Sequence, residues 1–185
     1  MNIKLKNIFF FLPLILVSIY YSFHRFNLQS AVDGGLILSG LVKYPDNFSN
    51  ITSIYYNSWV FLHHISFLLL KLNFSVNSIS IFFVFLVTFF NVTGIYLLSR
   101  GFKHSKILAL TISLVFIFLR INFGSLDYPI LFFSEHTYGT FAMATFTLIV
   151  GLLSNRNYKL AGFFSLLLFS SHLVVGIWII MLFLF

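Results

Sequence analysis

The chain has no cysteine and few charges, and both absences restrict what it can be. Without cysteine it forms no disulfide and offers no thiolate ligand to a metal. Charged residues make up 8% of its 185 residues, whereas a typical soluble domain carries about 25%. Hydrophobic residues make up 59%, and phenylalanine alone occurs 27 times. This composition leaves too little polar surface to cover the apolar side chains in water, so we expect an integral membrane protein.

Acidic residues are the scarcest charged type, with four against eleven lysines and arginines. The net charge of +7 has the sign that nucleic acid attracts. However, the basic residues occur in ones and twos between apolar runs and form no basic stripe. We therefore predict no nucleic-acid partner, and we interpret the cations as determinants of membrane orientation.

Apolar runs of helical length predict an all-α fold, a multi-pass transmembrane helical bundle with about five spans. The predicted spans are residues 8–23, 77–98, 107–122, 137–154 and 160–185. The first run is followed by bulky residues rather than a small-residue cleavage site, so we interpret it as an uncleaved span. No repeat or second domain is evident over 1–185, which predicts a single membrane domain. Because the last apolar run reaches the end of the sequence, we expect the N-terminal fragment of a longer chain.

Charge placement orients these spans with the N-terminus in the cytoplasm, as the positive-inside rule requires. The cytoplasmic segments then hold Lys4, Lys6, Arg100, Lys103, Lys106, Arg156 and Lys159. The outer segments hold every acid of the chain, namely Asp33, Asp46, Asp127 and Glu135. The expected location is a bacterial inner (plasma) membrane, with membrane lipid as the surrounding partner.

Two short helices are predicted to lie along the membrane in the first outer loop. Residues 58–72 would cover only about 22 Å, less than the roughly 30 Å hydrocarbon core. If they crossed the membrane, both basic turns would also move outside. Residues 34–43 place aliphatic side chains at helical spacing, and Pro45 ends the pattern. Asp33 stands at the start of this first interfacial helix.

The first outer loop carries Asp33-Gly34-Gly35, then Leu38 and Gly40, then Tyr44-Pro45-Asp46. With the preceding span, the two interfacial helices and the acidic second loop, it resembles the N-terminal half of the GT-C glycosyltransferases over residues 1 to about 140. Members of that family have about twice as many spans or more, so the match covers only part of their architecture. The resemblance implies an inverting transferase that moves sugar from a polyprenyl-phosphate donor to an acceptor on the outer face.

The resemblance also assigns roles to individual acids. It makes Asp33 the catalytic base or a ligand near it, and it makes Asp127 and Glu135 ligands for acceptor or metal. A divalent metal, Mg²⁺ or Mn²⁺, stays open as a cofactor of these three acids. Capping of the following helix explains Asp33 equally well, because aspartate is a favoured N-cap. Turn chemistry explains Asp127, which precedes Tyr-Pro.

Other candidate substrate-binding residues are cations and histidines near the predicted spans. Arg120, at the outer end of a span, either pairs with the donor phosphate or extends to the interface. Glu135 and His136 precede a span, where a charge is costly unless it faces outside or a cavity. His172 follows Ser170-Ser171 near the middle of the last span, where an ionisable residue indicates either function or a bond to a neighbouring helix.

Small residues and adjacent histidines have structural interpretations. Gly34 and Gly35 would let the backbone approach a ligand closely. His63 and His64 point about 100° apart on a helix and are too few for a zinc site, so we expect interfacial packing. Close helix contacts are predicted at Gly139, Ala142, Ala144, Gly162 and Gly176.

Two other functions remain open. A transporter or flippase for a small molecule or lipid would use His172 and would show a broken helix at mid-membrane depth. A non-catalytic assembly subunit would show no cavity. A transferase predicts instead that Asp33, Asp127 and Glu135 converge on one outer cavity.

Overall fold

A computed structural model describes residues 8–25, 32–42, 53–54, 56–57, 60–118 and 138–184. In these ranges the chain is helical, with short turns and no strand, which confirms the all-α fold class. The helices are α1 (Ile8–Arg25), α2 (Asp33–Leu38), α4 (Phe61–Lys71), α5 (Val76–Gly101), α6 (Lys106–Phe118), α7 (Tyr138–Ser154), α8 (Tyr158–Ser171) and α9 (Leu173–Leu184). Four residues outside these ranges, Arg120, Asp127, Glu135 and His136, were predicted to belong to the site.

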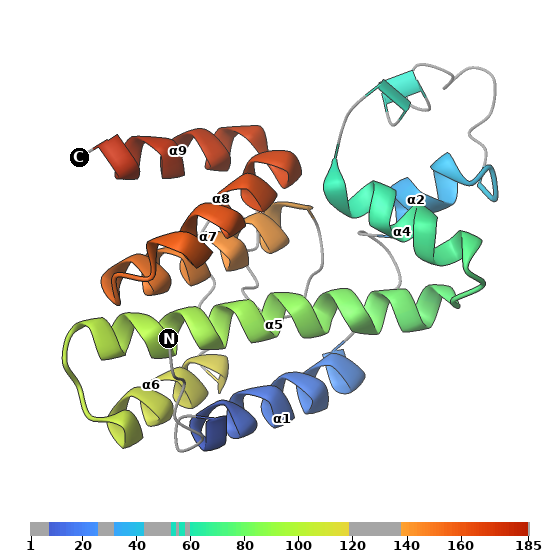
Figure 1. Ribbon diagram of the computed structural model, residues 1–185. Helices are drawn as coiled ribbons and strands as arrows, with labels where there is room; N and C mark the ends of the chain where they lie inside the picture. Colours follow the sequence, from blue (N-terminus) through green and yellow to red (C-terminus); the bar gives the residue numbers. More distant parts are fainter. Residues whose placement is uncertain are drawn as a thin grey trace.

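Helix α5 is the centre of the fold, with α7 along one side and α1 and α6 along the other (Figure 1). Its Phe83, Val87 and Phe90 are buried in one core with residues of α7, α8 and α9. Its Val92 and Tyr96 are buried in a second core with residues of α1 and α6. Because apolar positions surround it on both sides, α5 is the helix around which the others assemble.

The contact between α5 and α7 depends on two glycines. A Cβ added to Gly94 would lie 2.6 Å from the carbonyl carbon of Thr147 in α7. A Cβ added to Gly151 would lie 2.4 Å from the carbonyl oxygen of Gly94. The two backbones therefore approach more closely than any larger side chain permits. The small residues predicted to form close contacts include Ala142 and Ala144, and both are fully buried in α7.

Within the described residues, α5 is the one helix that is both long and apolar enough to cross a bilayer, with a mean hydropathy of 2.2. It occupies the predicted span at 77–98. The predicted spans at 8–23, 107–122 and 137–154 correspond to α1, α6 and α7, which are shorter apolar helices.

The predicted span at 160–185 differs from the structure. It forms two helices, α8 and α9, which are separated at His172. Figure 1 shows α9 turning back over α8 rather than continuing its direction. Gly176 makes this possible, since a Cβ there would lie 2.8 Å from the Cα of Phe169 in α8. Gly162 was also predicted to make a close helix contact, but no atom lies within 4 Å of a Cβ built there.

Three helices end in the same type of turn, with a residue in the left-handed region just beyond the end. These residues are Asn73, Lys103 and Arg156, with φ of 63°, 64° and 58°. After α5, for example, the amide of His104 donates to the carbonyl of Ser99 at 3.3 Å, as in a Schellman motif. Such turns satisfy the last carbonyls of each helix and reverse the chain within a few residues.

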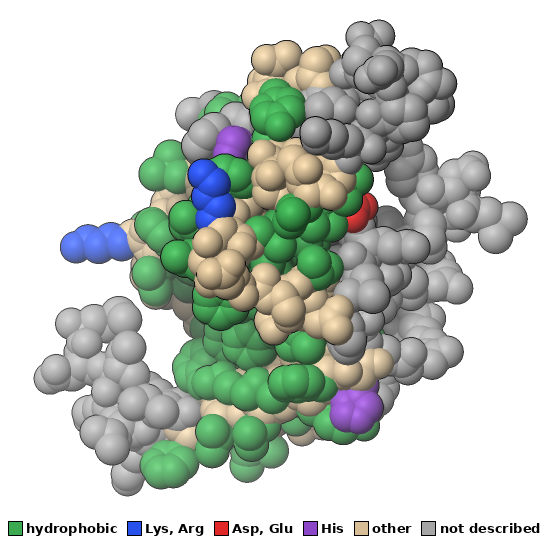
Figure 2. Space-filling view, turned by 90° about the vertical axis from the view of Figure 1, so that its right-hand side faces the viewer, with side chains coloured by type: hydrophobic (Ala, Val, Ile, Leu, Met, Phe, Trp, Pro, Cys, Tyr) green, Lys and Arg blue, Asp and Glu red, His purple; other side chains and the backbone are tan. Residues whose placement is uncertain are grey.

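Large hydrophobic side chains are exposed on several helices. Leu166 in α8 is 75% exposed, Ile107 in α6 is 73% exposed and Phe9 in α1 is 70% exposed. Figure 2 shows hydrophobic atoms across much of the described surface on the face that it presents. Exposed apolar surface of this extent is uncommon on monomeric soluble proteins.

Candidate functional site

Asp33 is the first residue of α2 and its side chain is exposed. The N-cap is Val32, which makes no side-chain capping bond, so Asp33 lies inside the first turn rather than at the cap. A carboxylate in that turn is still favoured by the positive end of the helix dipole. The helix is shorter than the predicted 34–43, because it ends at Leu38 and Gly40 then adopts a φ of 74°.

The two glycines after Asp33 hold α2 against α4. A Cβ on Gly34 would lie 2.3 Å from the Cγ and Cδ2 atoms of His63, and one on Gly35 would lie 2.4 Å from the Cβ of Ser66. We predicted that these glycines admit a ligand, but the structure uses their open faces for helix packing. The reason is that α4 supplies a ring and a backbone at the distance where a ligand would otherwise approach.

Helix α4 occupies most of the predicted interfacial segment 58–72. Its residues Leu62, His63 and Ser66 are buried, and the Ser66 hydroxyl donates to the carbonyl of Leu62 at 2.8 Å. The prediction that the adjacent histidines serve packing fits His63, which is only 7% exposed beneath Gly34. In the described part of the chain, no group of three histidines or acids is close enough to hold a metal.

Burial lowers the pKa of His63 below its usual value of 6.5, and the neighbouring His64 lowers this pKa further. Below about pH 6.5 the unfolded chain takes up a proton that the folded chain resists. Neutral, buried His63 therefore contributes its full stabilisation of the α2–α4 contact above that pH. This contribution decreases as the pH falls towards the pKa of His63 in the folded chain.

We expect amides of α2 and α4 to lose hydrogen-exchange protection when the pH is lowered from 7.5 to 5.5, after correction for intrinsic exchange. The variant His63→Phe keeps a flat ring but does not titrate, so its corrected protection is expected to be independent of pH. An equal loss of protection in the variant would assign the effect to another group.

His172 lies at the junction of α8 and α9, with an extended backbone (φ −156°, ψ 99°). Its backbone is hydrogen-bonded to both helices. The His172 amide donates to the carbonyl of Leu168, and the His172 carbonyl accepts from the amide of Gly176, both at 2.9 Å. Its Nδ1 accepts from the amide of Val175 at 3.5 Å, as a cap of α9. This interaction orients the ring at the start of α9.

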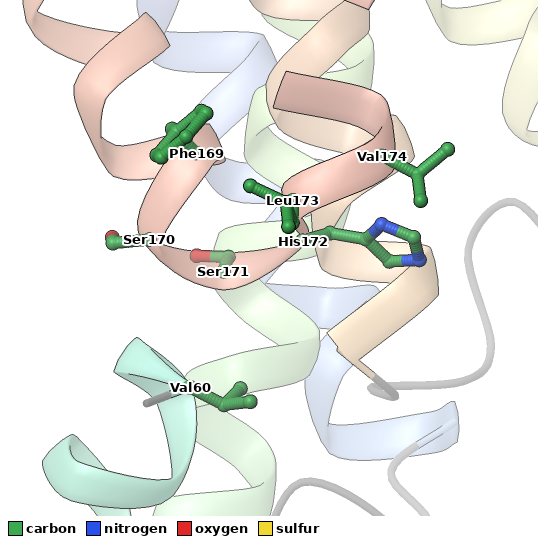
Figure 3. Close-up of a pocket in the computed structure, with 7 residues that line it drawn as sticks. All are labelled: Val60, Phe169, Ser170, Ser171, His172, Leu173 and Val174. Atoms are coloured by element: carbon green, nitrogen blue, oxygen red, sulfur yellow. The ribbon is translucent and has the colours of Figure 1, made fainter. Parts of the chain in front are cut away.

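A cavity of about 550 Å³ lies at this junction. Its lining combines apolar side chains with the two serines and the histidine: Val60, Phe169, Ser170, Ser171, His172, Leu173 and Val174. Figure 3 shows the His172 ring on one side of the turn and the Ser170 side chain on the other, with Val60 below the turn in this view. The hydroxyls of Ser170 and Ser171 both donate to the carbonyl of Leu167 at 2.8 Å, so their oxygens present acceptor lone pairs.

Helix α4 lies between the surroundings of the two described candidate residues, Asp33 and His172. Helix α2, with Asp33, packs along α4, and Val60 immediately before α4 lines the cavity of His172. The remaining predicted site residues, Arg120, Asp127, Glu135 and His136, lie outside the described residues. Their convergence with Asp33, and a Mg²⁺ or Mn²⁺ shared among the acids, stay predictions.

Sequence reasoning identified His172 but missed the apolar part of its cavity. Val60 and Phe169 belong to ordinary hydrophobic runs, and the contact of Gly176 with Phe169 that accompanies the fold-back is seen only in the structure. Comparisons with models of protein families, with curated proteins and with solved structures gave no match. Within the described structure the candidate residues are Asp33 on the α2–α4 pair and His172 at the α8–α9 turn.

Proposed function

We propose that the chain is a multi-pass integral membrane protein. Its exposed leucines, isoleucines and phenylalanines on α1, α6 and α8 support this, as does the length of α5. Tight turns join α5 to α6 and α7 to α8. Lipid around such a bundle would cover the apolar exterior that water does not.

The arrangement of the two basic turns supports the predicted orientation. The turn after α5 and the turn after α7 lie together, since a Cβ on Gly101 would be 2.5 Å from the Cβ of Ser154. The Asn155 side-chain amide also donates to the carbonyl of Leu97 at 2.5 Å. Helices α2 and α4 lie towards the opposite end of α5 (Figure 1). The basic residues of these two turns therefore lie at one end of α5 and Asp33 lies towards the other, which supports the predicted orientation.

Within this architecture we propose GT-C-like transfer of a sugar from a polyprenyl-phosphate donor to an acceptor on the outer face. The supporting observation is that Asp33 is an exposed carboxylate on a short helix fixed to α4 through Gly34 and Gly35. A base that takes a proton from an acceptor hydroxyl must be positioned and accessible, and this carboxylate is both.

The reaction needs little else from this part of the chain. The acceptor oxygen bonds to the anomeric carbon, the bond to the donor phosphate breaks, and Asp33 receives the acceptor proton. In this proposal Arg120 pairs with the leaving phosphate, while Asp127, Glu135 and His136 hold the acceptor or a divalent metal.

The test uses the full chain in lipid vesicles with tritiated polyprenyl-phosphate glucose and mannose as donors. Replacing Asp33 with asparagine keeps the shape of an exposed side chain but removes the base, so transfer is expected to fall by about 10²–10⁴-fold. Asp33→Glu is expected to retain part of the activity, and Lys71→Gln on α4 serves as a charge-changing control with unchanged activity. Equal transfer by Asp33→Asn and the parent chain would overturn the proposal.

Transport is the second candidate, because the chain breaks at His172 beside a cavity, as transporter helices do at their binding sites. The same vesicles distinguish the two functions. If movement of the labelled lipid across the bilayer stops in His172→Leu and persists in Asp33→Asn, the chain is a carrier. If neither transfer nor movement occurs with the parent chain, the assembly-subunit interpretation is favoured.

A further inference from the structure

A second cavity, of about 410 Å³, lies between α5, α6 and α7 beside the turn that joins α5 to α6. It is separate from the cavity of His172, which belongs to α8 and α9. Most of its wall is apolar. Its lining includes Ile95, Leu98, Ser99, His104, Ile112 and Phe116. Aliphatic and aromatic walls of this kind suit a hydrocarbon chain.

Cations gather at the turn where this cavity ends. The Arg100 guanidinium donates to the carbonyl of His104, a lining residue, so its charge lies at the edge of the cavity. Lys103 is exposed in the same turn, and the Lys106 ammonium lies 5.3 Å from the centre of the Phe10 ring in α1. Asp33 is the one acid in the described residues, and it lies towards the other end of α5 (Figure 1). The local charge is therefore positive and uncompensated by any described carboxylate.

Inside the cavity, Ser99 supplies an unsatisfied polar group. Its side chain is 6% exposed, and its hydroxyl has no hydrogen-bond partner among the described residues. A buried hydroxyl without a partner is unfavourable, because the hydrogen bond that it makes to water in the unfolded chain is lost and not replaced. A ligand that offers an acceptor at this depth would remove that cost, and an ester carbonyl next to a hydrocarbon chain is such an acceptor.

We propose that this cavity binds an anionic phospholipid from the surrounding membrane. One acyl chain lies between Ile95, Ile112 and Phe116, and the phosphate lies against Arg100 and Lys103. An ester carbonyl accepts from the Ser99 hydroxyl. Basic cavities between helices on the cytoplasmic side are suited to anionic head groups. The site rests on the proposed membrane embedding but not on sugar transfer, so a loss of lipid binding and a loss of transfer are distinguishable.

The test is native mass spectrometry of the full chain in detergent with dioleoyl phosphatidylglycerol or dioleoyl phosphatidylcholine. We expect the anionic lipid to remain bound at least fivefold more than the zwitterionic one. Lys103→Gln removes an exposed charge and is expected to reduce binding of the anionic lipid about fivefold. Lys71→Gln, an exposed lysine at the end of α4, is the matched control and should leave binding unchanged.

The cavity itself is tested by Ile112→Phe, which fills it and is expected to reduce binding of both lipids. If that variant does not fold, Lys103→Gln carries the test, because the Lys103 side chain is exposed and its left-handed backbone is equally unfavourable for lysine and glutamine. Equal retention of the two lipids, or equal losses with Lys103→Gln and Lys71→Gln, would overturn the proposal. Competition by inorganic phosphate alone at the same concentration would show a site for free anions instead.

Discussion

Replacing Gly94 with alanine is expected to lower the free energy of unfolding by about 2–3 kcal/mol, although it adds only one methyl group. The added Cβ would lie 2.6 Å from the carbonyl carbon and oxygen of Thr147 and 2.7 Å from the amide nitrogen of Leu148. These are backbone atoms of α7, so no side-chain rotation relieves the clash. Helix α7 must move away from α5, and this is the most extensive helix contact in the described structure.

Gly162→Ala is the control for this prediction, because it makes the same change in α8 where no atom lies within 4 Å. There alanine is expected to raise stability by about 0.5–1 kcal/mol through its better helix propensity. Thermal unfolding of both variants in the same detergent measures the difference. A Gly94→Ala midpoint equal to or above that of Gly162→Ala would contradict the close contact between α5 and α7.

Replacing Gly35 with alanine is expected to separate α2 from α4. The new Cβ would lie 2.4 Å from the Cβ of Ser66 and 2.8 Å from the amide nitrogen of Phe67. Helix α2 has only six residues and is too short to be stable alone, so it depends on this contact. We expect hydrogen exchange in α2 to accelerate by at least tenfold, and sugar transfer to decrease with it if Asp33 is the base.

Ser39→Ala is the control for Gly35→Ala. It removes a hydroxyl that donates to the carbonyl of Leu36 at 2.8 Å but adds no atom towards α4. Its effect on exchange in α2 should stay below threefold. If Gly35→Ala leaves exchange unchanged while transfer falls, the glycine contacts substrate directly, as the sequence alone suggested.

The positions of most helices were accessible from the sequence because apolar runs and charged turns alternate. The basic residues around Arg100 and Arg156 separate α5 from α6 and α7 from α8, as predicted. The amphipathic segment ending at Lys71 also predicted α4 as a helix distinct from α5. These boundaries depend on local polarity, which a single sequence displays directly.

The fold-back at His172 was not predictable in the same way. Helix α9 is apolar on every face, so neither hydropathy nor periodicity distinguishes a continuing span from a returning helix. The polar residues Ser170, Ser171 and His172 were noticed as a functional anomaly, but their effect on backbone direction depends on Gly176 meeting Phe169. That contact is tertiary, and no local pattern encodes it.

In the candidate site, too, local features were predictable from the sequence and tertiary contacts were not. The sequence predicted that Asp33 begins a surface helix, and the structure places it in the first turn of α2. It did not predict that Gly34 and Gly35 serve helix packing. A glycine leaves room beside the backbone, but the sequence does not show whether a ligand or another helix fills that room. Whether the acids of the second loop approach Asp33 stays a prediction.

The Asn155–Leu97 hydrogen bond joins residues 58 positions apart, and this separation has a consequence for synthesis. Ribosomes add roughly 5–20 residues per second, so α5 emerges about 3–12 s before its partner α7 is complete. During that interval the face of α5 around Gly94, which later lies against Thr147 and Leu148, has no α7 beside it. We therefore expect α5 to complete its packing only after α7 has been synthesised.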